Sequence, residues 1–153
     1  MFLLWLSMKE PNREEISQKL DLYELSFSHV INNLQSLQLG RVSISRPARG
    51  EWSPVDIQIF RGHNEGYILA DGETAKHLEL LLNIGVQIIR FEVNYTYFMF
   101  WSTLDRSVGL IYIGDPENVD LSFSLPFLVH KEKLNIEGWY FYISDFNIFR
   151  RNL

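Results

Sequence analysis

The chain has 153 residues, no cysteine, and 14 lysine and arginine residues against 19 aspartate and glutamate residues, which gives a net charge of -5. This length fits a single compact domain, 1–153, and the absence of cysteine excludes disulfides, thiolate nucleophiles and thiolate metal sites. The acidic balance disfavours a nucleic-acid partner, because affinity for nucleic acid depends on cationic side chains that neutralise phosphates.

The first residues form an apolar run that is too short for an export signal or a membrane span. Residues 2–6 are apolar, but no basic region precedes them, and a signal core needs roughly 7 to 15 apolar residues. A membrane helix needs ~18 uninterrupted apolar residues, which the sequence does not contain. We therefore expect a buried first strand at 2–6, no membrane partner and a cytoplasmic location.

Residues 12–39 have the pattern of a long helical segment. Asn12 and Glu15 have the spacing of a capping box, Pro11 prevents the helix from extending upstream, and Gly40 is the expected stop. Apolar residues recur every three or four positions, which places them on one face of the helix. The predicted stripe is Ile16, Leu20, Tyr23, Phe27, Val30 or Ile31, Leu34 and Leu37.

Two leucines of this segment, Leu22 and Leu25, lie off the predicted stripe. Either the segment consists of two helices with a break near Asp21, or it is one helix that is buried on more than one face. Both alternatives keep the capping box and the stripe, so the sequence leaves the choice between them open.

Short strands alternating with turn-rich loops follow the helical segment. The expected strands are 41–45, 55–60 and 67–71. A second helix is expected over 71–85, with Asp71 or Thr74 as its N-cap and Gly85 as its terminator. Its predicted buried stripe is Ala75, Leu78, and Leu81 or Leu82.

The stretch 87–101 is rich in aromatic residues and has two patterns. Up to Tyr97 apolar and polar residues alternate strictly, which is typical of a half-buried strand. The polar positions expected to face water or a partner are Glu92, Asn94 and Thr96. Residues 98–101 are apolar on both faces, so we expect this end to be covered on both sides. Because no Gly, Pro or Asn-Gly pair interrupts the pattern, we predict one long strand with a bend or bulge near Tyr97, and not a hairpin.

Two further apolar segments complete the expected sheet. Residues 107–113 follow a turn and are the expected antiparallel partner of the aromatic strand, and residues 138–143 repeat the same character. These three strands are apolar on both faces at one end, and two helices are available to cover them. The sequence therefore predicts an α+β fold: a mainly antiparallel sheet with one long N-terminal helical segment and a second, shorter helix packed against it.

No motif for a reaction, a cofactor or a metal ion is present. The four histidines include no pair one helical turn apart, as the HExxH class of metal site requires, and neither a GxSxG nucleophile motif nor a phosphate-binding glycine loop occurs. We predict no cofactor, no metal site and no catalytic residue. The alternative is a small hydrolase in which His63, with Glu65 or Asp71, acts as acid and base.

The clearest polar cluster is GDPENVD, residues 114–120, and its carboxylates are candidates for partner contact. A cluster of this kind can attract a basic protein, although Gly, Asp, Pro and Asn are also the residues of an ordinary turn. A calcium loop is disfavoured, because the ligand positions of an EF-hand are missing. The predicted contact residues are Asp105, Asp115, Glu117, Asp120 and the loop residue Trp52.

In general character the chain resembles the immunity proteins with which bacteria neutralise toxins. The resemblance rests on a compact acidic domain without cysteine, on acidic loops such as GDPENVD, and on the segments FMFWSTLDRSVGLIYIG and GWYFYISD. It implies a non-enzymatic protein that binds and inhibits a cognate toxin domain, commonly a basic nuclease. A monomer and a homodimer are both compatible with this interpretation, because a second chain could complete the apolar surface at 98–101.

Overall fold

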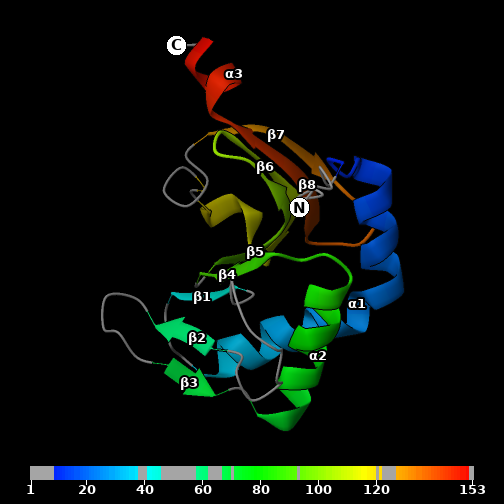
Figure 1. Cartoon of the computed structure of the whole chain (residues 1–153), viewed down its shortest axis with the longest axis vertical. Coiled ribbons are helices and arrows are strands. Elements are labelled where there is room, and N and C mark those ends of the chain that lie inside the picture. The colour runs from blue at the N-terminus through cyan, green and yellow to red at the C-terminus, as the bar shows by residue number, and fades with distance from the viewer. Residues whose placement is uncertain are drawn as a thin grey trace, which may run out of the picture.

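The structure, a computed structural model, describes residues 9–37, 41–45, 58–61, 67–69, 71–92, 94–119, 121 and 127–151. Within these residues eight strands form one sheet in the order β3-β2-β1-β4-β5-β6-β8-β7, and every neighbouring pair is antiparallel. The two longer helices lie together beside the sheet (Figure 1). This architecture confirms the predicted α+β class. The strand expected at 2–6 and the stop expected at Gly40 lie outside the described residues.

The elements have the following bounds. The strands are β1 Val42–Ser45, β2 Gln58–Arg61, β3 Tyr67–Leu69, β4 Ile88–Phe91, β5 Tyr95–Ser102, β6 Arg106–Ile113, β7 Leu128–Lys133 and β8 Trp139–Asp145. The helices are α1 Arg13–Ser36, α2 Gly72–Asn83, α3 Phe146–Arg151 and the 3-10 turn η2 Pro116–Asn118. Among the described helices, none has the length and apolar character that crossing a membrane requires.

Helix α1 begins where the sequence predicts. The side-chain oxygen of Asn12 accepts a hydrogen bond from the backbone N–H of Glu15 at 2.9 Å, and the Glu15 carboxylate accepts one from the backbone of Asn12 at 2.9 Å. This is the predicted capping box. The buried residues of the helix are Ile16, Leu20, Ser26, Phe27, Val30, Ile31 and Leu34. They confirm most of the predicted stripe, but Leu37 follows the last helical residue and is exposed.

A kink divides α1 at Tyr23, where φ is -121° and ψ is 20°, outside the helical region. Leu22 and Leu25, on either side of the kink, are 76% and 86% exposed. The alternative of one helix buried on several faces is therefore wrong. The break expected near Asp21 exists and lies shortly after it.

Helix α2 has a defined cap at each end. Asp71, and not Thr74, is the N-cap: its carboxylate accepts backbone hydrogen bonds from Glu73 at 3.0 Å and from Thr74 at 2.8 Å. At the other end the backbone N–H groups of Gly85 and Val86 donate to the carbonyls of Leu82 and Leu81. This is a Schellman motif, and it needs the φ of 116° that Gly85 adopts. Gly85 thus terminates the helix as predicted.

The two helices pack antiparallel, as a series of side-chain contacts shows. From one end to the other these contacts are Asn33 with Asp71 at 3.1 Å, Ser26 with His77 at 2.9 Å, and Lys19 with the carbonyl of Ile84 at 2.6 Å. Residue numbers fall along α1 as they rise along α2, so the helices run in opposite directions. The second helix therefore packs against the first, as expected.

The predicted single strand over 87–101 is wrong, because the chain reverses direction between β4 and β5 and the two strands pair as a hairpin. The backbone N–H of Glu92 donates to the carbonyl of Tyr95 at 2.8 Å across the reversal. The carboxylate of Glu92 also pairs with Arg41, just before β1, at 2.6 Å. The reversal is thus stabilised by a residue distant in sequence, and no local turn signal marks it.

This reversal distributes the aromatic residues over both faces of the sheet. Phe98 and Phe100 are buried in the core beneath the helices, as predicted, whereas Tyr95 and Tyr97 are buried in a second cluster on the opposite face. Of the polar positions expected to face water, Asn94 is exposed, Glu92 is half-buried and Thr96 is 1% exposed. The expectation is therefore wrong for Thr96, because the face it shares with Phe98 is covered.

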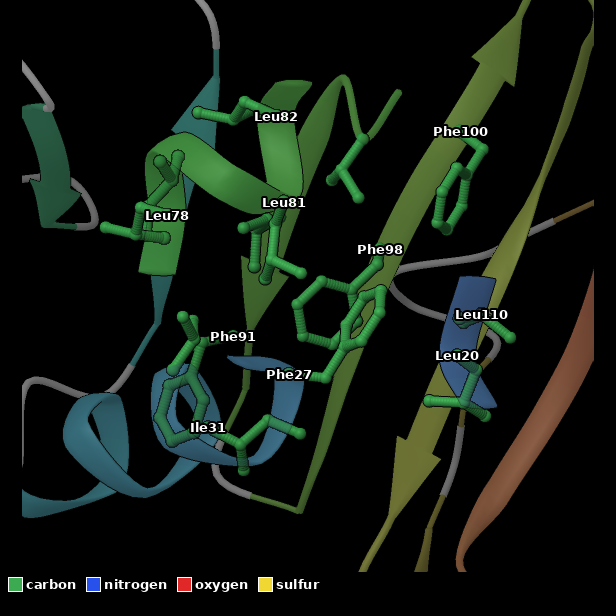
Figure 2. Close-up of a cluster of buried hydrophobic side chains, with 14 of the residues drawn as sticks. Leu20, Phe27, Ile31, Leu78, Leu81, Leu82, Phe91, Phe98, Phe100 and Leu110 are labelled. Atoms are coloured by element: carbon green, nitrogen blue, oxygen red, sulfur yellow. The ribbon is translucent and has the colours of Figure 1, made fainter. Parts of the chain in front are cut away.

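The main core lies between the helices and the sheet, with Phe27 of α1 near its centre. The Phe27 ring meets Phe98 and Trp139 edge-on, with ring centroids 4.9 Å and 5.5 Å apart. Figure 2 shows Phe27 facing Phe98, with Leu81 of α2 close to both. Packing of this kind joins α1, α2, β5 and β8 into one hydrophobic unit.

The pairing predicted between the aromatic strand and 107–113 is confirmed, and the structure adds a pairing of 107–113 with 138–143. β5 pairs with β6 and β6 with β8, and the register between β5 and β6 shifts at Phe100, which is a bulge slightly beyond the expected position at Tyr97. A Cβ atom on Gly109 would lie 2.1 Å from the carbonyl oxygen of Phe98. Glycine is therefore required opposite the bulged strand.

The edge strand β7 is strongly charged. Among the described strands β7 pairs only with β8, and its sequence is LVHKEK. His130, Lys131 and Lys133 are exposed, and the Lys131 ammonium lies 5.2 Å from the centroid of the Tyr140 ring on β8. This edge therefore presents mainly charged side chains.

An ion-pair network connects three distant parts of the chain. The Arg106 guanidinium contacts Glu10 at 2.7 Å and Asp145 at 2.9 Å. Asp145 also accepts a hydrogen bond from the backbone N–H of Ile148 at 3.0 Å, at the start of α3. That hydrogen bond first, and Arg106 second, lower the pKa of the Asp145 carboxyl below its ordinary value.

Candidate functional site

Two of the predicted contact residues lie together in the loop after β6. The Asp115 carboxylate accepts a hydrogen bond from the backbone N–H of Glu117 at 3.2 Å and caps the 3-10 turn η2. Both side chains are exposed. Asp115 therefore organises the turn, and Glu117 projects from it.

Asp105 lies at the opposite end of β6, in the turn that follows β5. Its carbonyl accepts a hydrogen bond from the backbone N–H of Phe146 at 2.8 Å, and its side chain is exposed. β6 has eight residues, so at ~3.3 Å per residue Asp105 and Asp115 are separated by roughly 25 Å or more. The structure thus does not bring these carboxylates into one site.

Each of these two ends has a shallow depression. The one beside Asp115 has a volume of about 220 Å³ and is lined by Gln35, Glu92, Asn94, Tyr95, Thr96, Tyr112, Gly114 and Asp115. The one beside Asp105 has a volume of about 280 Å³ and is lined by Met99, Ser102, Thr103, Leu104, Asp105, Arg106, Ser107, Phe127 and Ser144. Both are smaller than the roughly 300 to 1,000 Å³ of typical ligand pockets.

The remaining predicted residues divide into two groups. Trp52, Asp120, His63 and Glu65 lie outside the described residues. Asp71, the alternative partner of His63, is described and occupied: besides capping α2, its carboxylate accepts hydrogen bonds from the Thr74 hydroxyl at 3.0 Å and from Asn33 at 3.1 Å. Hydrogen bonds from Thr74, its backbone N–H first, lower the pKa of the Asp71 carboxyl. The hydrolase hypothesis stays a prediction.

A cluster that the sequence did not suggest lies between α1 and α2. His29 of α1 and His77 of α2 stack with ring centroids 4.2 Å apart and an angle of 30° between the rings. Glu73 precedes His77 by one helical turn, and one ligand atom from each of the three residues lies within 4.8 Å of the others. We call His29, Glu73 and His77 the histidine cluster.

The sequence contained part of the signal for the histidine cluster. Glu73 and His77 have the i, i+4 spacing of neighbours on one helix face. A search for two histidines on one helix missed the cluster, because the second histidine belongs to α1 and reaches His77 only through antiparallel packing. Pairing of the two helices, and not the spacing along either, creates the site.

Hydrogen bonds position both rings. Nδ1 of His77 lies 2.9 Å from the hydroxyl of Ser26, and Nε2 of His29 lies 3.4 Å from the hydroxyl of Thr74. Ser26 and Thr74 are buried, while both histidines are half-buried. The rings are thus held from inside the helix pair, and part of each reaches its surface.

Exposed leucines adjoin the histidine cluster. Leu25 lies one turn before His29 on α1, and Leu80 lies one turn after His77 on α2. Because the helices are antiparallel, both leucines lie on the same side of the cluster. Leu22, on the other side of the kink, is also exposed, and we call Leu22, Leu25 and Leu80 the leucine surface. Their exposed fractions are 76%, 86% and 38%.

Acidic side chains border the leucine surface on α1. Asp21 and Glu24 directly precede Leu22 and Leu25, and all four are exposed.

Comparison with protein-family models, with characterised proteins and with solved structures finds no match to this chain. The geometry of these surfaces is therefore the basis for proposing a function.

Proposed function

We propose that the protein is a non-enzymatic binding module that binds and inhibits a basic protein partner, as immunity proteins inhibit nuclease-type toxins. The observation that carries this proposal is the leucine surface with its acidic neighbours on α1. Burying an exposed leucine stabilises a complex by about 1.5 to 3 kcal/mol in transfer free energy. A second protein can supply the cover that the described residues do not give Leu22 and Leu25.

The arrangement around these leucines matches the anatomy of protein interfaces. Interfaces combine a few apolar anchors near the centre with a polar rim that excludes water. Leu22 and Leu25 supply the anchors, and Asp21 and Glu24 supply charge beside them. α2 contacts α1 on both sides of the kink that separates the two anchors, through Lys19 and Ser26.

The charge of the chain favours a basic partner. With a net charge of -5, the protein attracts cationic surfaces and repels acidic ones, which mainly affects the rate and selectivity of association. A nuclease presents such a surface, because its substrate is a polyanion. Asp105, Asp115 and Glu117, which lie at two separate ends of the sheet, contribute to this attraction in our proposal and are not all in contact with the partner.

The test is binding to, and inhibition of, the toxin domain encoded by the adjacent gene. We expect a one-to-one complex by isothermal titration calorimetry, and we expect the double variant Leu22→Ser/Leu25→Ser to bind about thirtyfold or more weakly, as loss of interface anchors does. The matched control is Leu104→Ser, which changes a fully exposed leucine in the β5–β6 turn. It should retain the affinity of the unchanged protein.

A second pair of variants distinguishes long-range electrostatic attraction of the partner from direct contact with it. Asp115→Asn and Glu117→Gln should slow association severalfold at low salt and change dissociation little, because screened charges outside the contact act on the encounter. If no complex forms with any adjacent gene product, the proposed function is wrong. If a complex forms but the double leucine variant binds normally, the contact surface lies elsewhere than on α1.

A further inference from the structure

We propose that His29, Glu73 and His77 bind one divalent transition-metal ion of the zinc class, which bridges helices α1 and α2. This inference is independent of the proposed partner, because it concerns the isolated chain. It also revises the sequence-based expectation of no metal site. Three steps support it: the identity of the ligands, their geometry and the hydrogen bonds that orient the rings.

The ligand set suits zinc and similar ions. Two imidazoles and one carboxylate are donors of the type that zinc takes with bond lengths of about 2.0 to 2.2 Å. The alternative divalent ions, calcium and magnesium, prefer sites made of oxygen ligands. A site with two histidines therefore selects a transition metal.

Metal binding requires rotation of side chains, because the two imidazoles are stacked with 30° between their planes, whereas a metal ion lies close to the plane of each ring that binds it. One ligand atom from each residue already lies within 4.8 Å of the others. Tetrahedral coordination at ~2.1 Å needs neighbouring ligand atoms about 3.4 Å apart. Glu73 is exposed and both histidines are half-buried, so in this proposal rotation of the Glu73 side chain and of one imidazole brings the ligand atoms to this spacing.

The hydrogen bonds present one free ring nitrogen from each histidine. When Nδ1–H of His77 donates to the Ser26 hydroxyl, Nε2 keeps its lone pair for a metal ion. The Thr74 hydroxyl donates its proton to the Asp71 carboxylate at 3.0 Å, so its oxygen is an acceptor for Nε2–H of His29. That leaves Nδ1 of His29 for the metal.

These two hydrogen bonds are of the kind that orients the histidines of a metal site. Metal-binding histidines commonly donate their other N–H to an oxygen that fixes the ring and its tautomer. Here Ser26 and Thr74, both buried, perform that role from opposite helices. Three protein ligands leave a fourth coordination position, which water can fill.

The experiment is titration of the metal-free protein with Zn²⁺ by calorimetry, and with Co²⁺ followed by visible absorption. We expect one ion per chain and, with Co²⁺, absorption bands typical of nitrogen and oxygen ligands in low coordination number. His29→Gln and His77→Gln should weaken binding about tenfold or more, and Glu73→Gln should weaken it severalfold. Bound metal should also raise the midpoint of thermal unfolding, since the ion binds only the assembled helix pair.

The matched control is His130→Gln on β7. His130 is an exposed histidine that lies 3.3 Å from a carboxylate, Glu132, but no second histidine among the described residues joins this pair. Its substitution should leave metal binding unchanged. Glu73→Gln tests the proposal even if a histidine variant misfolds, because this exposed side chain is not part of the core.

Two results would overturn the proposal. One is the absence of stoichiometric Zn²⁺ binding to the folded protein. The other is binding that Glu73→Gln and His77→Gln leave intact while circular dichroism shows both variants folded. Neither result depends on whether a toxin partner exists, so failure of the metal site and failure of the proposed function are distinguishable.

Discussion

Phe27 of helix α1 contacts two strands of the sheet. It is completely buried and meets Phe98 of β5 and Trp139 of β8 edge-on. Aromatic pairs of this geometry contribute about 0.5 to 1.5 kcal/mol beyond the burial of their area. Removal of the Phe27 side chain should therefore weaken the packing of α1 against both β5 and β8.

Replacing Phe27 with Ala should lower the free energy of unfolding by about 3 to 5 kcal/mol, because the substitution leaves a cavity between helix and sheet. Urea denaturation followed by circular dichroism measures this change. Leu25→Ala is the matched control on the same helix: Leu25 is 86% exposed, so its loss should change stability by no more than about 0.5 kcal/mol. Equal effects of the two variants would contradict the assigned core.

Whether the surroundings of a single residue could be predicted depended on whether they come from neighbouring residues in the sequence. Phe27 was predictable because helical spacing alone places it on the buried stripe. Thr96 was not, because its burial depends on a chain reversal that the sequence pattern concealed. His29 was missed for a related reason: its neighbour His77 belongs to another helix. Residues whose surroundings come from distant segments have no signature in a short window.

At the scale of elements, three of the boundaries of the two long helices are set by residues close to them in sequence. Asn12 and Glu15 cap α1 reciprocally, and Asp71 and Gly85 delimit α2. Each of these three boundaries is built from residues within a few positions of the helix end and was predictable, whereas α1 ends at Ser36, before the stop predicted at Gly40. The β4–β5 hairpin differs, since its reversal involves the ion pair between Glu92 and Arg41. A prediction from local turn residues therefore merged two strands into one.

The cap of α1 provides the element-scale prediction. Asn12→Ala should lower the free energy of unfolding by about 1 kcal/mol, because it removes the acceptor for the backbone N–H of Glu15. Asn32→Ala is the matched control: Asn32 is exposed inside the same helix, where alanine is the better helix former. The control should keep or slightly raise stability. Equal losses for both variants would show that the capping box does not stabilise the helix.

At the scale of the whole molecule, Arg106 at the start of β6 connects the residues before α1 with the end of β8, where α3 begins. Its guanidinium contacts Glu10 before α1 and Asp145 at the end of β8. The Arg106 side chain is 26% exposed and that of Asp145 10%, so the pair is partly shielded from solvent. Residues from both ends of the described chain therefore depend on one cation.

This network predicts a dependence of stability on pH. The folded protein has a lowered pKa at Asp145, so the carboxylate contributes stability above the ordinary pKa of an aspartate, near 4, and that contribution is lost as pH falls through the lower folded value. Asp145→Asn keeps an oxygen that can accept from Ile148 but removes the charge. The urea midpoint of this variant should lie below that of the unchanged protein at about pH 7, and the gap should narrow towards about pH 3.

Asp105→Asn is the control for this measurement, because Asp105 is exposed and lies next to Arg106 in sequence. It should shift the urea midpoint little at either pH. A gap for Asp145→Asn that stays constant between neutral and acid pH would contradict the electrostatic explanation and would indicate altered packing instead.

The charged edge strand β7 has a consequence for how the protein behaves when concentrated. An uncovered strand edge can add a strand from a neighbouring molecule, and such additions lead to aggregation. Along β7 the lysines at 131 and 133 would oppose the same lysines of an approaching copy. Repulsion between like charges across a strand pair disfavours that addition. Where the described residues leave this edge without a further strand, its lysines therefore oppose its use as a template for fibres.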